Sequence, residues 1–415
     1  MIRGHSPSRG AWLLAAGVLF LTLVASAAAT DDWPQWRGPN RDGMSTERGL
    51  LKAWPQGGPS LGWRAQGAGE GYSSFAVAGG TLYTLGARGG DEFVMAFNAA
   101  GGKKVWETRL GRRFNNNQGG GPRGTPTVDG DRLYAYGASG DLAALDRATG
   151  KPIWSVNVLQ RFGGSNIQWG LSESPLVLDD RILVAAGGPK GSIVALRKTD
   201  GGTIWQAGSD RAGYSSAVLH EVGGIRQAIF FTASQATGVN VQDGRVLWNY
   251  ARVSNRTANI ATPIVRGNRV FLSSDYGTGA ALLELTPKGG GLDAREVYFT
   301  NDMRNHHASS VLIGDHLYGF SSAILTSMRF DTGEVAWRDR SVGKGSVIFA
   351  DDRLYLFSEQ GVVGLAEPTP AGYREHGRFT IATGRLPTWS HPVVAGGRLF
   401  LRDQDTIYAY DVRSK

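Results

Sequence analysis

A glycine followed four positions later by a tryptophan recurs along this chain and constrains its fold more than any other feature. The recurring pairs are Gly102–Trp106, Gly150–Trp154, Gly201–Trp205, Gly244–Trp248 and Gly333–Trp337. Trp63 stands in the same place in a unit without the glycine, and the tryptophans from Trp63 to Trp248 follow one another at intervals of 43 to 51 residues. In two further units an aromatic residue replaces the tryptophan, and we expect these residues to be Phe299 and Phe379. Self-similarity at such a period is the signature of a repeat architecture.

Each unit contains short apolar stretches separated by glycine-rich turns, which is the pattern of a small antiparallel sheet. The chain has 60 glycines in 415 residues, roughly twice the usual share, as expected where many tight turns need positive φ angles. A four-stranded sheet cannot bury both faces alone, whereas radial stacking of such sheets buries the faces between neighbours. A large aromatic ring can wedge against the next sheet, and the glycine lets the backbone approach the ring closely. The repeat therefore predicts an all-β protein of the β-propeller type.

The two ends of the repeat array predict how the ring closes. The last unit, from Trp389 to Val412, supplies three strands but no tryptophan strand. The segment SLGWRAQG (Ser60–Gly67) is a tryptophan strand with no unit before it. If it pairs with the last three strands, the chain forms an eight-bladed β-propeller closed by an N-terminal strand. Seven blades remain the alternative, because the units that end at Phe299 and Phe379 are irregular.

The N-terminus has the features of a secretory signal peptide: basic residues, the apolar stretch Ala11–Ala25 and the small residues Ala27–Ala29. A membrane anchor is the alternative, but the apolar stretch is shorter than the roughly 20 residues a span needs. We expect an exported, soluble, periplasmic or secreted protein, without a lipid anchor because the chain has no cysteine. The expected organisation is a signal peptide at 1–29, a lead-in segment at 30–59 and a single propeller domain at 60–415.

The charge pattern argues against nucleic-acid binding. The formal net charge is +8 at pH 7, but lysine and arginine are scattered and never form a long run. Nucleic-acid binding needs basic residues clustered on one face. We therefore expect no nucleic-acid partner and no transmembrane segment in the mature chain.

The segment LDRATGKPIW (Leu145–Trp154) shows the repeat most clearly and resembles the tryptophan-docking motif of the pyrroloquinoline quinone (PQQ) repeat family. The resemblance extends from Ser60 to Val412. The opening DWPQWRGPNRDGMS (Asp32–Ser45) resembles a lead-in of exported single-domain members, which we interpret as a polar strap across one face of the propeller.

The resemblance implies two functional classes. Quinoprotein dehydrogenases hold PQQ and Ca²⁺ near the propeller axis, tend to be larger and often carry adjacent cysteines, whereas propellers similar to BamB are non-catalytic scaffolds. The absence of cysteine favours the second class. We expect a monomeric, non-catalytic binding or scaffold protein of the cell envelope without a cofactor, whose partner is an envelope protein, a peptide or a small molecule. The alternative is a PQQ-dependent alcohol or sugar dehydrogenase that uses PQQ with Ca²⁺.

The connections that lead into the first strand of each unit are rich in polar and aromatic residues, and on a propeller they converge on one mouth of the central channel. Functional residues tend to lie on such loops. An ordinary solvated funnel is the alternative to a ligand site. The predicted ring of candidate ligand-binding residues comprises Tyr72, Arg123, Trp169, Glu173, Tyr214, Asn259, His306, His307, Lys344, Trp389 and His391.

The same ring offers little for metal binding or catalysis at the level of sequence. His306, His307 and His391 with Glu173 could bind a transition metal, but adjacent residues of a strand point to opposite faces, so we expect no metal site. A carbohydrate-processing enzyme would need two opposed carboxylates, and only Glu173 is a candidate. No catalytic residue is assigned.

Overall fold

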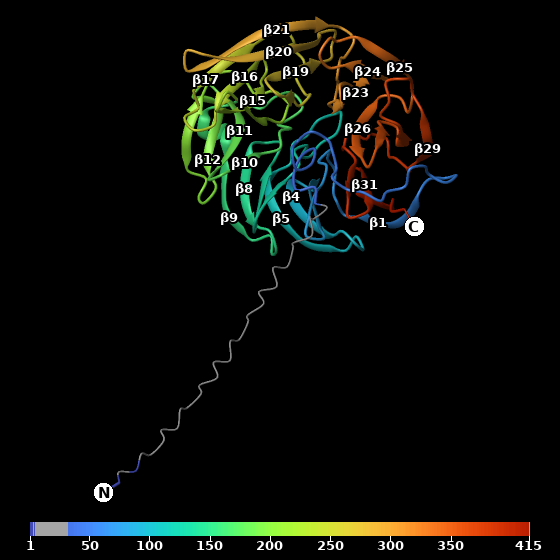
Figure 1. The fold of residues 1–415 in the computed structure, drawn as a ribbon, viewed down its shortest axis with the longest axis horizontal. Coiled ribbons are helices and arrows are strands. Elements are labelled where there is room, and N and C mark those ends of the chain that lie inside the picture. Colours follow the sequence, from blue (N-terminus) through green and yellow to red (C-terminus); the bar gives the residue numbers. More distant parts are fainter. Residues whose placement is uncertain (3, 5–31, 415) are drawn as a thin grey trace. The chain divides into compact units, whose positions relative to one another are not determined.

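The computed structural model describes residues 1–2, 4 and 32–414. The predicted signal peptide lies almost entirely outside the described residues. All strands belong to one compact unit, Asp31–Lys415. They form eight four-stranded antiparallel sheets arranged as blades around a central axis (Figure 1). The prediction of an eight-bladed propeller is confirmed.

Each of the first seven blades is a meander of four consecutive strands, innermost strand first. The first three blades are β2 (Ala76–Ala78), β3 (Thr81–Arg88), β4 (Asp91–Asn98), β5 (Lys104–Arg112); β6 (Thr127–Asp129), β7 (Arg132–Tyr136), β8 (Asp141–Asp146), β9 (Pro152–Asn157); and β10 (Leu176–Leu178), β11 (Arg181–Gly188), β12 (Gly191–Arg197), β13 (Thr203–Ala207). The next two are β14 (Val218–Val222), β15 (Ile225–Phe231), β16 (Ala236–Asn240), β17 (Val246–Tyr250); and β18 (Ile264–Arg266), β19 (Arg269–Ser274), β20 (Gly279–Lys288), β21 (Gly291–Thr300). The sixth and seventh are β22 (Val311–Ile313), β23 (His316–Ser321), β24 (Ile324–Arg329), β25 (Val335–Asp339); and β26 (Gly345–Ala350), β27 (Arg353–Ser358), β28 (Val362–Ala366), β29 (Glu375–Thr380). One short helix, α1 (Val158–Phe162), follows β9 in the described part of the chain.

The eighth blade closes the ring with strands from both ends of the domain. Its order is β1-β32-β31-β30, where β1 is Ser60–Gln66, β30 is Val393–Ala395, β31 is Arg398–Asp403 and β32 is Thr406–Asp411. Strand β1 pairs antiparallel with β32. The N-terminal closing strand expected from the sequence is therefore present, which settles the count at eight blades rather than seven.

Tryptophans of the outer strands pack between neighbouring blades. The ring of Trp63 lies so close to Gly102 of the next blade that a Cβ there would come within 2.5 Å of it. Trp63 Nε1 also donates a hydrogen bond to Ala99 O at 3.0 Å in that blade. Thus the glycine meets the tryptophan of the preceding blade, not of its own unit. The same arrangement joins Trp106 to Gly150, Trp154 to Gly201 and Trp205 to Gly244.

Other units depart from this arrangement. Tyr298, and not Phe299 as expected, takes the tryptophan position in β21: its ring lies against Gly333 and its hydroxyl donates to Phe330 O at 2.8 Å in the next blade. The neighbouring residue Phe299 instead lies under the guanidinium of Arg252. The alternation of side chains along a strand explains the error, because a shift by one residue exchanges the two faces.

Two tryptophans differ as well. Trp248 donates from Nε1 to Gln227 Oε1 at 2.6 Å within its own blade. Trp337 donates to Thr369 O at 2.7 Å in the next blade. Phe379 lies against Gly58, beside β1 of the eighth blade, so it does take the place of a tryptophan at that interface.

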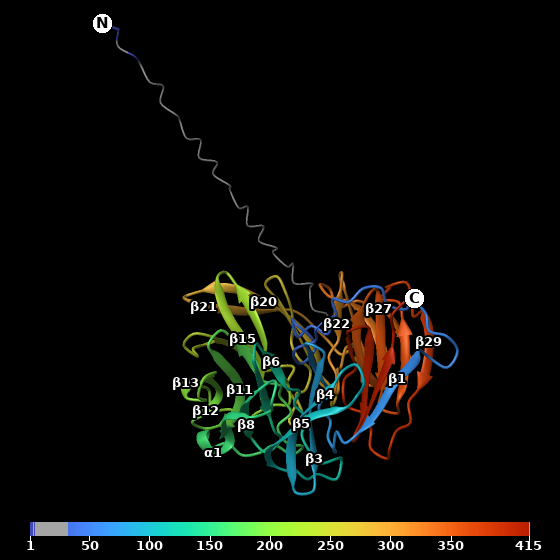
Figure 2. The same ribbon diagram turned by 90° about the horizontal axis from the view of Figure 1, so that it is seen from below.

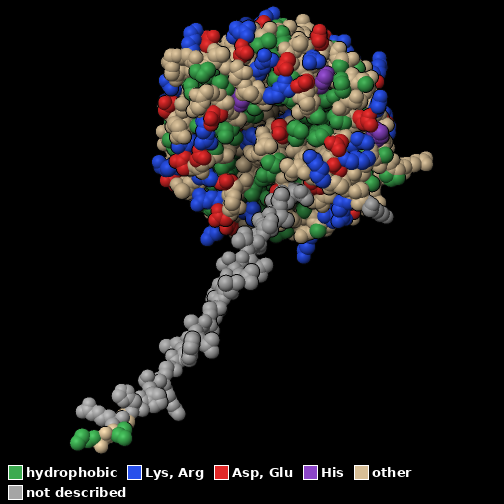
Figure 3. Space-filling view, viewed as in Figure 1, with side chains coloured by type: hydrophobic (Ala, Val, Ile, Leu, Met, Phe, Trp, Pro, Cys, Tyr) green, Lys and Arg blue, Asp and Glu red, His purple; other side chains and the backbone are tan. Residues whose placement is uncertain are grey.

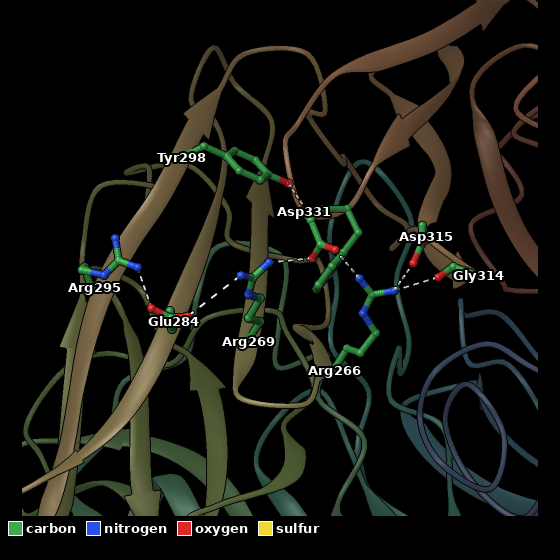
Figure 4. A network of polar contacts seen from close by, with 9 residues as sticks. Arg266, Arg269, Glu284, Arg295, Tyr298, Gly314, Asp315 and Asp331 are labelled. Atoms are coloured by element: carbon green, nitrogen blue, oxygen red, sulfur yellow. Dashed lines mark hydrogen bonds and ion pairs between the residues drawn. The ribbon is translucent and has the colours of Figure 1, made fainter.

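A chain of ion pairs crosses the interface between the fifth and sixth blades (Figure 4). Asp331 lies between Arg266 at 3.0 Å and Arg269 at 2.7 Å. Glu284 then links Arg269 to Arg295. Because these groups are partly exposed, each pair adds little stability on its own. Together the pairs connect the fifth blade to the sixth blade beside Tyr298.

The lead-in segment lies over one end of the channel. Innermost strands run from the connecting loops to their hairpin turns, and the lead-in contacts those turns: Asp32 accepts from Gly79 N, and Leu50 N donates to Asp351. The lead-in end is therefore opposite to the loop end. Figure 2 shows the blue lead-in at the upper end of the ring, whereas the β3–β4 hairpin projects at the lower end.

Two arginines fix the lead-in to the residues that immediately precede two innermost strands, β22 and β14. Arg37 donates to Ser310 O at 2.7 Å, and Arg41 donates to Ala217 O at 2.9 Å. Both side chains are buried, and burial lowers each pKa from 12.5 to about 10, so both remain cationic at neutral pH. The lead-in segment is thus held at this end of the channel by buried hydrogen bonds.

The surface shows no basic cluster on the face drawn in Figure 3, where lysine and arginine alternate with aspartate and glutamate. Among the described residues, no helix is long and apolar enough to cross a membrane.

Candidate functional site

The loop end of the channel contains a cavity of about 630 Å³, which we call the axial pocket. It lies where the connections into the innermost strands converge, as the sequence predicted. The predicted residues that line it are Tyr72, Arg123, Trp169, Tyr214, His306, His307, Lys344, Trp389 and His391.

Two predicted residues do not reach the pocket. Glu173 is only 2% exposed and its Oε2 accepts a hydrogen bond from Ala185 N at 2.6 Å. Asn259 is 1% exposed and its Nδ2 donates to Thr232 O and Ala233 O, both at 2.9 Å. Both side chains turn toward backbone groups that would otherwise be buried without partners. Burial raises the pKa of Glu173 to about 8.

Aromatic rings form most of the pocket wall. Tyr72 and Trp389 have ring centroids 4.8 Å apart, and Trp169 and Tyr214 lie 5.7 Å apart. Aromatic pairs at such distances bury much apolar area while leaving ring faces and polar edges for a ligand. The wall therefore contains two pairs of packed aromatic rings.

The lead-in segment forms the inner end of the pocket, which we call its floor. From the sequence this segment was predicted only to be a polar strap across one face of the propeller. Trp36 lines the pocket, its ring lies 4.5 Å from that of His391, and its Nε1 donates to Thr262 Oγ1 at 2.9 Å. Burial lowers the pKa of His391 to about 3, so this imidazole is neutral. The strap therefore closes the pocket from below.

Arg123 is the main cation of the wall. It lies over the Tyr72 ring at 5.4 Å and donates to Gly119 O and Gly121 O. These bonds hold the glycine-rich loop in place. Burial raises the pKa of the neighbouring Tyr72 hydroxyl to about 12, so Tyr72 stays neutral and donates a hydrogen bond.

His306 and His307 both face the pocket, contrary to the alternation expected for a strand. They lie in a bend that precedes β22, where the backbone does not alternate. Each offers a ligand atom to a cluster with Glu359, in which all ligand atoms lie within 4.8 Å of one another. Burial lowers the pKa of both imidazoles, so both are neutral at pH 7.

Sequence reasoning missed several residues of the site. Glu359 lies in the turn between β27 and β28, whereas the predicted residues all belong to loops that enter innermost strands. Tyr276 was missed for the same reason, because it lies in the turn between β19 and β20. Its ring centroid lies 5.2 Å from that of His306. On an antiparallel blade these turns lie at the same end as the loops, which is the signal that points to both residues. The other missed lining residues are Trp36, Gln118, Gln168, Ser172, Ser216, Thr257, Ile260 and Pro387.

The donor set does not fit Ca²⁺ with PQQ. Ca²⁺ takes six to eight oxygen ligands, largely carboxylates. No carboxylate is among the described residues that line the pocket, and Glu359, which lies beside the two histidines, is already paired with Lys344 at 3.1 Å. Glu173, the other carboxylate considered, is turned toward the backbone.

The central part of the chain, residues 90–339, matches the family model described as outer membrane protein assembly factor BamB. BamB of Shewanella oneidensis is 27% identical over 281 residues, which cover 62% of this chain and 66% of that protein. BamB of Burkholderia pseudomallei is 27% identical over 192 residues, which cover 46% of this chain and 42% of that protein. The alignments thus span under two thirds of these relatives' length.

Solved structures share the fold. The crystal structure of BamB from Moraxella catarrhalis superposes with a TM-score of 0.61 at 14% identity, covering 85% of this chain and 99% of that one. A quinohemoprotein alcohol dehydrogenase from Pseudomonas putida HK5 gives a TM-score of 0.60 at 12% identity, covering 93% and 81%. At such identities these likenesses establish the propeller and do not discriminate between scaffold and dehydrogenase.

Proposed function

Because this chain belongs to the PQQ-like repeat propeller family whose model is described as outer membrane protein assembly factor BamB, we propose that it is a non-catalytic binding propeller of the cell envelope. In this proposal the protein is exported, soluble, monomeric and free of a lipid anchor, and the axial pocket is its recognition site.

The composition of the pocket wall carries the proposal. Trp169, Tyr214 and Trp389 line it with partly exposed rings, whereas its charged groups are engaged: Arg123 donates to backbone carbonyls, and Lys344 pairs with Glu359. General acid–base catalysis needs a titratable group free to exchange a proton near the working pH. The neutral His391 and Tyr72, with pKa values of about 3 and 12, lie far from that range.

The partner that fits this wall is a polypeptide segment with an aromatic side chain. Such a side chain can insert between the Tyr72–Trp389 and Trp169–Tyr214 pairs, and a ring that stacks there contributes binding energy beyond its buried area. Strands of outer-membrane β-barrels carry aromatic residues in girdles at both membrane interfaces. An assembly factor for such barrels would meet this chemistry.

The test combines genetics with direct binding. The gene is deleted in its native host, and folded outer-membrane barrel protein is measured after complementation. We expect rescue by the wild-type chain and by Ile153→Ala, a change on the exposed outer strand β9, but not by the double variant Trp169→Ala, Trp389→Ala. Barrel-derived peptides with and without their aromatic residue are titrated in parallel. Full rescue by the pocket variant, or equal binding of both peptides, would refute the proposal.

The dehydrogenase alternative has its own assay. The purified protein is mixed with PQQ and Ca²⁺, and dye-linked oxidation of alcohols and sugars is measured. We expect neither a bound chromophore nor turnover, because no carboxylate is among the described residues that line the pocket, and Ca²⁺ sites are built largely from carboxylates. Stoichiometric PQQ binding with turnover would overturn the non-catalytic assignment.

A further inference from the structure

We infer that His306, His307 and Glu359 form a binding site for a divalent transition-metal ion beside the axial pocket, which the two histidines line. This inference goes beyond the proposed function and stands whichever partner the pocket takes.

The geometry is close to that of a preformed site. One ligand atom from each residue lies within 4.8 Å of the other two. Three atoms at the corners of a triangle with that side lie at most about 2.8 Å from its centre, whereas Zn–N bonds are about 2.0–2.1 Å long. Each ligand atom would therefore move by about 0.7 Å or less to bind an ion, which small rotations of the side chains provide.

The histidines have free coordination capacity. The His307 side chain is 9% exposed, yet neither Nδ1 nor Nε2 has a hydrogen-bond partner, and His306 Nδ1 is also buried without one. Buried polar atoms without partners are rare in native proteins and call for a reason. A metal ion that takes a ring nitrogen of His307 would supply that reason.

Neighbouring groups hold the carboxylate in place. Trp389 Nε1 donates to Glu359 Oε1 at 2.6 Å, and His307 Nδ1 lies 3.5 Å from the same oxygen. Groups that orient ligating carboxylates in this way commonly strengthen metal sites. Lys344 Nζ, 3.1 Å from Glu359 Oε1, acts in the opposite sense, because its positive charge must move away before a cation can bind.

The donor set selects the class of ion. Two imidazoles with one carboxylate suit Zn²⁺, Co²⁺, Ni²⁺ or Cu²⁺, whereas Ca²⁺ and Mg²⁺ prefer oxygen ligands. Because His306 and His307 line the axial pocket, a bound ion would lie beside the cavity and could keep a coordination position toward it. A partner side chain or water can occupy that position.

The test is a titration of the purified full chain with Zn²⁺ by calorimetry and with Co²⁺ by its visible absorption. We expect one ion per chain, and a loss of affinity of at least tenfold in Glu359→Gln and in His307→Ala. The first variant keeps the shape of the side chain and its bond to Trp389, so it stays informative if the second does not fold. His306→Gln provides a third arm.

Two further variants separate this site from casual binding by surface histidines. His376 lies 3.3 Å from the Glu367 carboxylate outside the pocket, so His376→Ala is a matched control that should leave the affinity unchanged. Lys344→Met removes the competing cation and should tighten binding several-fold. Absence of 1:1 binding, or wild-type affinity in both Glu359→Gln and His306→Gln, would overturn the inference.

Discussion

Replacing Gly150 by alanine should destabilise the propeller at one defined blade interface. Gly150 has φ +72°, and an added Cβ would lie 2.5 Å from Trp106 Cε3 and 2.6 Å from Trp106 Cδ2. The left-handed backbone alone costs an alanine about 1 kcal/mol, and forcing an extra methyl into a packed interface costs about 1–3 kcal/mol more. We therefore expect the free energy of unfolding to fall by about 2–4 kcal/mol.

A glycine in the same blade supplies the control. Gly130 has φ +59°, but nothing lies within 4 Å of its added Cβ. Gly130→Ala should therefore cost only the backbone part, about 1 kcal/mol. Urea unfolding followed by far-ultraviolet circular dichroism measures both variants. In a Trp106→Ala background the cost of Gly150→Ala should fall toward that of Gly130→Ala, because the ring is gone and Thr108 Oγ1, at 2.9 Å, remains the close neighbour of the added Cβ. Equal costs for the two glycines in the wild-type background would refute the packing role assigned to the ring.

Three further predictions concern buried groups. Burial raises the pKa of Glu173 from 4.5 to about 8, so the folded state binds the extra proton and the free energy of unfolding falls as pH rises between these values; Glu173→Gln should remove that part of the decline in a series of urea titrations. Arg402→Met should lower the free energy of unfolding by about 3 kcal/mol or more, because the buried guanidinium donates to carbonyls of the neighbouring blade, Leu85 O among them; wild-type stability would contradict this. Trp36→Ala should enlarge the axial pocket and raise the binding of a small hydrophobic fluorophore, without preventing folding; unchanged dye binding would argue against a floor role for Trp36.

The blades could be predicted from the sequence because one residue pattern recurs in each. Strand alternation, glycine turns and the tryptophan period are local signals, and ring closure followed from counting strands at both ends. The exchange of Phe299 for Tyr298 shows where local signals become insufficient. Both residues are aromatic, and only the register with β20 decides which one faces the next blade.

The pocket was predicted less completely, because its members come from three kinds of segment. Loops that enter innermost strands could be recognised by position, and most of their predicted residues line the cavity. Glu359 lies in the β27–β28 turn, and Trp36 lies in the lead-in segment. Only the closed ring of blades brings these two segments close to the predicted loops. Glu173 and Asn259 were placed in the right loops, but hydrogen bonds to the backbone turn their side chains away.

Closure by β1 also has a consequence for the order of folding. Ser60 pairs with Asp411, so β1 must wait until β32 has been made, whereas strands inside the other blades pair with neighbours a few residues away. Joining points this distant costs about 5 kcal/mol of chain entropy by the logarithmic loop-closure relation, and non-local pairings of this kind are slow to form. Until β1 docks, the edge of β32 remains open to pairing with another chain. A chain that stops before β32 would therefore leave β1 without its partner strand, so the ring can close only after β32 has been synthesised.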